Sequence, residues 1–142
     1  MNPTSILYPG IAMFFLTLGV LAWLGLSRAR AIREGSVSIR YFRTYDEGSQ
    51  PARLHLLARH VQNHFEVPPL FYAAILFTYV GGAVTPWSVA LAWLFVLARC
   101  AHSVIHLGPN NVRVRFVTFG ASLVVLTGLW VTLLVHLLRA AP

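Results

Sequence analysis

The chain contains few negatively charged residues and little cysteine. Its 142 residues include no lysine, one cysteine and four acidic side chains. A single cysteine, Cys100, cannot form a disulfide within the chain, so the sequence gives no sign of an oxidising compartment. Charged residues make up only 11% of the chain and hydrophobic residues 57%. This composition indicates a polytopic membrane protein without a separate soluble domain.

Long apolar runs define the expected fold. An uncharged run begins at Ile6, and because no positive charge precedes it, it does not have the pattern of a cleaved signal peptide. The uncharged stretch 67–98 is too long for one span, and Gly81, Gly82 and Pro86 supply a break within it. We therefore predict an all-α membrane protein with one four-transmembrane-helix domain over residues 1–142. The expected helices cover about residues 6–27, 52–80, 86–107 and 112–138.

The positive charge comes from arginine alone and gives a net charge of +7. Nucleic acid is not an expected partner, because the arginines are not interleaved with aromatic residues on a soluble face. They gather in the segment 28–53 and again at Arg113 and Arg115, whereas the connection around 81–86 has no charge. By the positive-inside rule, the first and third connections face the cytoplasm and both termini lie outside it. We expect a bacterial inner membrane, with arginines of the first connection contacting anionic membrane lipids.

The second expected helix carries polar residues that run into its apolar part. At 100° per residue, Arg59, Asn63 and Glu66 share one face, with Gln62 beside them. The prolines of the pair 68–69 should kink the helix just beyond this face.

The third expected helix carries a second polar face. Arg99, His102, Ser103 and His106 recur at positions i, i+3, i+4 and i+7. Ionisable residues at membrane depth are costly and normally face a bundle interior or a watery cavity.

Arginines outnumber carboxylates in these two polar faces. The single carboxylate, Glu66, is set against Arg59, Arg99, Arg113 and Arg115. This excess suits a site that receives an anion. The alternative is a buried ion pair between Glu66 and one arginine that only fixes the helix register.

The stretch 59–71, RHVQNHFEVPPLF, resembles the signature of the MAPEG family, the membrane-associated proteins in eicosanoid and glutathione metabolism. The family pattern is an arginine, an asparagine four residues later, a glutamate three beyond and a proline three beyond that. Arg59, Asn63, Glu66 and Pro69 match it. The segment 98–116 is similar to the family's connection between its third and fourth helices.

This resemblance implies a homotrimer in which neighbouring subunits bind glutathione as a cosubstrate near the cytoplasmic face. Because one small bundle would not shield both polar faces from lipid, we further predict that the second helix lines the central axis of the trimer. The resemblance also implies that an arginine at the start of the fourth helix stabilises the thiolate. That thiolate would attack a lipophilic small-molecule substrate. Arg115 is the first choice for this catalytic role and Arg113 the second. The residues expected to bind glutathione are Arg59, Gln62, Asn63, Glu66, Arg99, His102 and His106.

A second function stays open. The family also includes non-catalytic members that bind lipid or act as scaffolds. This chain has His102 and His106 where glutathione-using members often carry tyrosines. Fewer binding contacts are therefore expected, and a lipid-binding or scaffolding protein is the alternative to a glutathione transferase.

Two histidine pairs have the i, i+4 spacing of metal ligands. They are His60 with His64, and His102 with His106. Neither pair has an evident third ligand, and His60 and His64 point away from the face of Arg59. We therefore expect no metal site and assign these histidines to packing or to the membrane interface.

Overall fold

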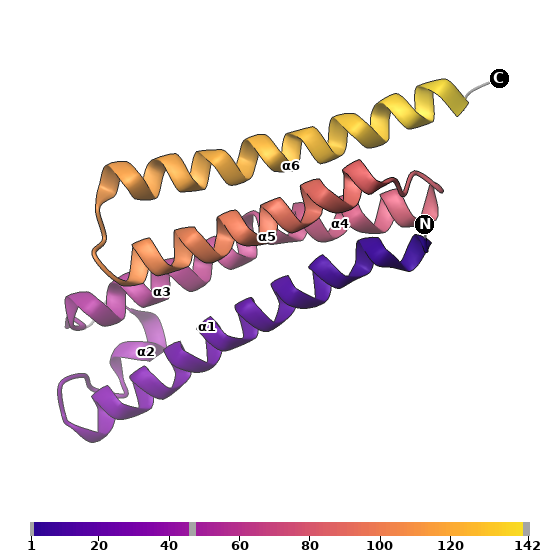
Figure 1. Ribbon diagram of the computed structural model, residues 1–142. Coiled ribbons are helices and arrows are strands. Elements are labelled where there is room, and N and C mark those ends of the chain that lie inside the picture. The colour runs from indigo at the N-terminus through magenta and orange to yellow at the C-terminus, as the bar shows by residue number, and fades with distance from the viewer. Residues whose placement is uncertain (1, 46–47, 141–142) are drawn as a thin grey trace.

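The computed structural model describes residues 2–45 and 48–140, and these residues form helices joined by loops. The elements are η1 (Pro3–Ile6), α1 (Leu7–Arg33), α2 (Tyr41–Thr44), α3 (Ala52–Glu66), α4 (Pro68–Val80), α5 (Pro86–Leu107) and α6 (Val112–Ala140). Figure 1 shows α1, the α3–α4 pair, α5 and α6 running side by side as a bundle. The all-α prediction is confirmed for the described part of the chain.

Both ends of the described chain lie at one end of the bundle, together with the turn between α4 and α5 (Figure 1). The connection from α1 to α3 and the turn between α5 and α6 lie at the opposite end. The two arginine-rich connections of the sequence therefore share one end of the molecule, as the charge distribution predicted.

Within the described residues, three helical stretches are long and apolar enough to cross a membrane. They are Pro3–Arg33, Pro86–Leu107 and Val112–Ala140. The α3–α4 pair forms a bent helix beside them. The third expected helix matches α5 at both ends, because Thr85 caps it by accepting a hydrogen bond from the Ser88 backbone N–H and Pro86 occupies its first turn.

The predicted end of the first helix, at residue 27, was wrong. Helix α1 continues to Arg33 and is followed by Gly35, which has a positive φ of 72°. The prediction followed the apolar run, but arginine and alanine in 28–33 are good helix formers. Arg30 Nε also donates to Glu34 Oε1 at 2.7 Å. The helix therefore stops where glycine permits a left-handed turn, beyond the end of its apolar part.

The second expected helix, residues 52–80, is two helices. Helix α3 ends at Glu66 and α4 begins at Pro68, with Val67 between them. A proline lacks the N–H that would continue the backbone ladder, and its ring clashes with the preceding turn. The predicted kink is thereby confirmed, and it places Glu66 at the last turn of α3.

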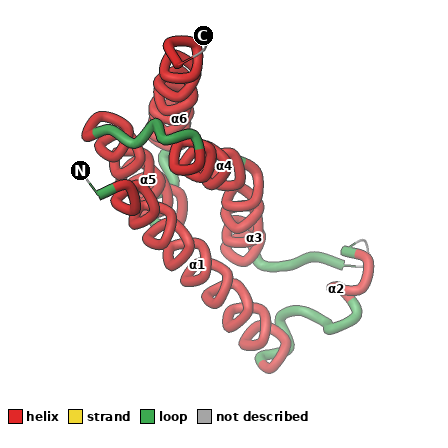
Figure 2. The backbone as a smooth tube through the Cα atoms, turned by 90° about the vertical axis from the view of Figure 1, so that its right-hand side faces the viewer, coloured by secondary structure: helices red, strands yellow, loops and turns green. Residues whose placement is uncertain are grey.

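Two groups of buried residues hold the bundle together. One joins α1, α4, α5 and α6 around Phe71 and Phe95, whose rings stack with centroids 4.3 Å apart. The other joins α1, the α1–α3 connection and α3 around Leu24 and Leu57. Helix α6 packs on α5 and α4, but within the described residues it contacts neither α1 nor α3. Figure 2, viewed from the side of Figure 1, shows α6 and α1 on opposite sides of the molecule.

Candidate functional site

A cavity of about 450 Å³ opens between α3, the end of α5 and the beginning of α6. This volume lies in the range of small-molecule sites. Its lining residues are His55, Leu56, Arg59, Asn63, His102, His106, Val112, Arg115, Phe116 and Phe119. We call this space the α3–α6 cavity. It exists because α3 and α6 are held apart, each resting on α5.

The α3–α6 cavity brings together five of the nine residues that the sequence singled out. They come from three helices and are Arg59, Asn63, His102, His106 and Arg115. No aspartate or glutamate of the described chain lines the cavity. It therefore presents two guanidinium groups to a ligand without a neutralising carboxylate in its wall.

The other four predicted residues lie outside the wall of this cavity. Gln62 and Glu66 are exposed on α3, where Gln62 Nε2 donates to Glu66 Oε1 at 3.1 Å. Arg113 is exposed on α6. Arg99 is buried in the interior of the bundle.

Arg115 is held by the turn that starts α6. Its Nη1 donates to Asn110 Oδ1 at 2.8 Å, and its backbone N–H donates to the Asn111 carbonyl at 2.9 Å. Asn111 caps the helix, because its Oδ1 accepts from the backbone N–H groups of Arg113 and Val114. The guanidinium of Arg115 is therefore tied to a capped helix end, and its other N–H groups are available to a ligand.

Arg99 is a buried cation with unused hydrogen-bonding capacity. It is 0% exposed. Its Nη2 donates to the Asn63 carbonyl at 3.1 Å, and its guanidinium carbon lies 5.7 Å from the centre of the Phe119 ring. Its Nε and Nη1 have no partner among the described residues. Unpaired buried donors are costly, so these two groups point to a ligand or an ordered water.

Glu66 forms no ion pair within the described residues of its own chain, where the one salt bridge is Arg30–Glu34. The buried Glu66–arginine pair considered from the sequence is therefore not a feature of one chain. A carboxylate near membrane depth that is exposed on its own chain needs a covering protein surface or a water-filled cavity.

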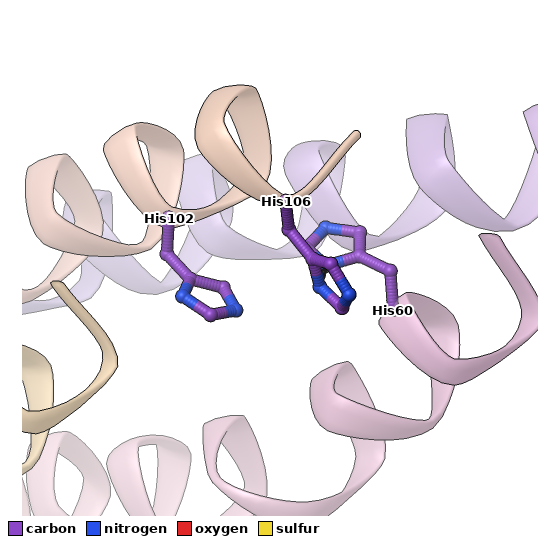
Figure 3. Close-up of side chains that lie close together, drawn as sticks. All are labelled: His60, His102 and His106. Atoms are coloured by element: carbon purple, nitrogen blue, oxygen red, sulfur yellow. Dashed lines mark hydrogen bonds between the residues drawn. The ribbon is translucent and has the colours of Figure 1, made fainter. Parts of the chain in front are cut away.

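Three histidines from two helices form a group that the sequence did not predict. His60 on α3 and His102 and His106 on α5 are all buried, and one nitrogen of each lies within 4.8 Å of one nitrogen of each other ring. Figure 3 shows the three rings turned toward one another from these two helices. The sequence showed no evident third imidazole for either i, i+4 pair, and in the structure the third imidazole of this group comes from the other helix.

Other contacts of the site were not expected from the sequence. Ser103 accepts from or donates to His60 across the helix pair, with Oγ and Nε2 3.0 Å apart. Phe116 and Phe119 add apolar walls to the α3–α6 cavity. His64 turns away from this cavity, and its Nδ1 lies 2.9 Å from Thr17 Oγ1 of α1. The helical periodicity of α5 does predict that Ser103 and His106 share a face. It does not predict which helix packs against that face.

A second cavity, of about 200 Å³, lies between the end of α1 and the start of α3. Its wall includes Arg30, Glu34 and Arg53. Two of these charges already pair with each other, since Arg30 binds Glu34 at 2.7 Å. The α3–α6 cavity is therefore the stronger candidate for an anionic ligand.

Fold and site together define an integral multi-pass membrane protein, a helical bundle with a basic, histidine-containing cavity near one end. The chain belongs to the MAPEG family, whose model matches residues 6–135. The MAPEG fold is a four-helix membrane bundle, and the family includes membrane glutathione transferases. No curated protein and no solved structure matches the chain.

Proposed function

We propose that the protein is a membrane glutathione transferase that joins the glutathione thiolate to a lipophilic electrophile. The observation that carries this proposal is the α3–α6 cavity, which gathers Arg59, Asn63, His102, His106 and Arg115, with no carboxylate among the described residues of its wall. Glutathione is a peptide with two carboxylates, one ammonium and one thiol. A basic cavity with an amide and aromatic walls suits that set of groups.

The carboxylates of glutathione would be bound by arginine. Arg59 lines the cavity, and guanidinium groups bind carboxylates with paired hydrogen bonds. Arg99 lies behind Asn63 with Nε and Nη1 unpartnered in the described chain, so it adds positive potential on the same side. The ammonium group would bind Glu66, whose Oε1 is positioned by Gln62.

Arg115 would stabilise the thiolate. A free thiol has a pKa near 8.5, so only a small share is thiolate at neutral pH. A guanidinium favours the anion and cannot itself take the proton. The proton therefore leaves to water, the sulfur forms its bond to the electrophilic carbon, and the leaving group departs with the bonding electrons. Arg115 fits this role because Asn110 fixes its position at the cavity wall.

A homotrimer would complete the site. Glu66 and Gln62 are exposed on the protomer, and the α3–α6 cavity is open on its flank. In a bilayer, such groups are covered by protein or line a watery space. We propose that a neighbouring copy covers this face, with α3 and α4 lining the central axis. The site would open toward the cytoplasm, with both termini on the other side of a bacterial inner membrane.

Conjugation by the purified protein tests this function. In detergent, with glutathione and a panel of lipophilic electrophiles, the wild-type chain should form thioether product. Arg115→Ala should lower kcat by roughly 10²- to 10³-fold, the range seen when one charge-stabilising donor is removed. Arg113→Ala, which removes the exposed runner-up, should lower it far less.

Arg139→Ala is the matched control, because Arg139 is an exposed arginine of the last turn of α6. It should behave as wild type. Absence of product across the panel, or equal losses in the Arg115 and Arg139 variants, would refute the proposal.

A specific feature favours a second candidate, a lipid-binding member without catalysis. An apolar groove of about 460 Å³ runs between α1 and α5 and is lined by Phe15, Leu16, Gly19, Val20, Trp23, Ser103, Val104, Leu107 and Gly108. Such a groove suits an acyl chain. This candidate predicts that a copurified lipid raises the melting temperature and glutathione does not. A melting temperature raised by glutathione and insensitive to delipidation decides against it.

A further inference from the structure

His102 and His106 line the α3–α6 cavity, but the steps proposed for the transferase assign no role to the cluster that they form with His60. The three side chains are 0%, 2% and 3% exposed, and they meet at the junction of α3 and α5 (Figure 3). Their closest approach is between His60 Nδ1 and His106 Nδ1, at 3.0 Å. Three buried imidazoles from two helices are more than packing of a hydrophobic core requires, because each carries a polar edge that needs a partner.

The surrounding hydrogen bonds fix which nitrogen of His60 is bare. The Ser103 hydroxyl has one hydrogen, and it donates to the Arg99 carbonyl at 2.9 Å. Ser103 Oγ can then only accept from His60 Nε2, which lies 3.0 Å away. His60 therefore carries its proton on Nε2 and presents the lone pair of Nδ1 toward His106.

The same reasoning fixes His102. Its Nδ1 lies 3.3 Å from the Arg115 carbonyl, which can only accept. Thr118 Oγ1, 3.4 Å from the same nitrogen, has its own hydrogen within reach of the Val114 and Arg115 carbonyls. His102 thus carries its proton on Nδ1. Its Nε2 is bare, buried and without a partner in the described chain.

These two contacts have the form of the outer shell around metal-binding histidines. In such sites a ligating imidazole donates its other N–H to a carbonyl or hydroxyl, which fixes its tautomer and orientation. Here a serine holds His60 and a backbone carbonyl holds His102. His106 completes the set through Nδ1 once its proton moves to Nε2, a change that leaves its charge at zero.

We propose that His60, His102 and His106 bind a transition-metal ion of the zinc class. A tetrahedral ion with Zn–N bonds of about 2.0–2.1 Å places its ligand nitrogens about 3.3 Å apart. The cluster starts within reach of that geometry, with 3.0 Å between two nitrogens and no separation in the set above 4.8 Å. Metal binding would require side-chain rotations that bring the three bare nitrogens together.

The fourth coordination position would face the α3–α6 cavity, because His102 and His106 line it. Arg99 lies beside the cluster, because its backbone carbonyl accepts from Ser103, which also contacts His60. A divalent ion beside a buried guanidinium is unfavourable unless an anion separates the charges. Arg99 Nε and Nη1 are buried and unpartnered in the described chain, so they would be donors for an anion that extends from the cavity wall into the interior. The site is thus one of three imidazoles and one exchangeable anionic ligand, the open arrangement found in catalytic zinc sites.

Cobalt(II) is the probe that tests this site directly. Tag-free protein in detergent, stripped with a chelator, is titrated with Co²⁺ while its visible absorption is recorded, and bound metal is measured by mass spectrometry. The proposal expects about one ion per chain, the intense d–d bands of tetrahedral cobalt, and displacement by Zn²⁺. Neither readout involves glutathione or turnover, so its result is separate from that of the proposed function.

Variants show which side chains bind the ion. His60→Ala, His102→Ala and His106→Ala should each weaken Co²⁺ binding by at least about tenfold, whereas His136→Ala on α6 should not. Ser103→Ala keeps all three ligands and removes only the acceptor that orients His60. Ser103→Ala should weaken Co²⁺ binding about tenfold, and it tests the proposal even if a variant of one of the three histidines does not fold. Wild-type protein that takes up no Co²⁺ with tetrahedral bands, or cluster variants that bind it as His136→Ala does, would overturn the proposal.

Discussion

The side-chain oxygen of Asn110 accepts a hydrogen bond from Arg115 Nη1 at 2.8 Å. Asn110 has a positive φ of 48°, a conformation that asparagine adopts more readily than most residues. The turn before α6 thus combines an unusual backbone conformation with a side chain that holds the guanidinium proposed to bind the thiolate. The arrangement predicts that Asn110 acts on catalysis through Arg115.

Asn110→Gly tests this positioning role, because glycine accepts a positive φ and removes only the amide. We expect kcat to fall by roughly tenfold or more, since a mobile Arg115 is poorly oriented toward the thiolate. Glutathione affinity should change little. Steady-state kinetics with the chosen electrophile separate the two effects. A variant with wild-type kcat would show that Arg115 needs no support from the turn.

Arg99 is the second residue whose role can be separated from folding. Arg99→Met replaces a buried cation by an apolar side chain of similar length. Replacing buried charges by apolar groups is often neutral or stabilising, so the midpoint of thermal unfolding in detergent should stay unchanged or rise. Glutathione binding should weaken at the same time, because positive potential behind Asn63 is lost. A large fall in the unfolding midpoint would instead make Arg99 a structural residue.

The proposed trimer predicts the mass of the assembly in detergent. Native mass spectrometry in a mild detergent should show three copies of the chain, and Gln62→Cys should crosslink to a neighbouring copy because Gln62 lies on the exposed face of α3. Ala29→Cys, exposed on α1, is the control and should remain uncrosslinked. A stable monomer that still binds glutathione would remove the reason for sharing Glu66 between subunits.

Much of the fold follows from local sequence. Apolar run length, the break at 81–86 and the prolines at 68–69 predicted the number of long elements, the bend in the second and the bounds of α5. The end of α1 could not be predicted from the apolar run, because good helix formers extend a helix beyond its apolar part. Periodicity predicts which residues share a face, as it did for Arg59 and Asn63.

The histidine cluster could not be predicted from the pattern of either helix alone. His60 and His106 are 46 positions apart in the chain, and they meet because α3 packs against α5 with a particular rotation. That rotation is decided by the whole bundle, including the kink before Pro68. Spacing along either helix suggests pairs of ligands, and only packing between helices supplies a third. For the same reason, the spacing of polar residues along α3 did not predict that Glu66 is exposed on its chain.

Calorimetric titration of glutathione into the detergent-solubilised protein tests the central claim most directly. The account predicts saturable binding by wild-type protein and binding weakened by at least about tenfold in Glu66→Gln, because a hydrogen bond to a charged group contributes about 1.5–3 kcal/mol. Glu34→Gln, which removes a carboxylate from the exposed Arg30 pair, should bind as wild type does. No binding by the wild-type protein, or equal affinity in the Glu66 and Glu34 variants, would contradict a glutathione site on this face of the bundle.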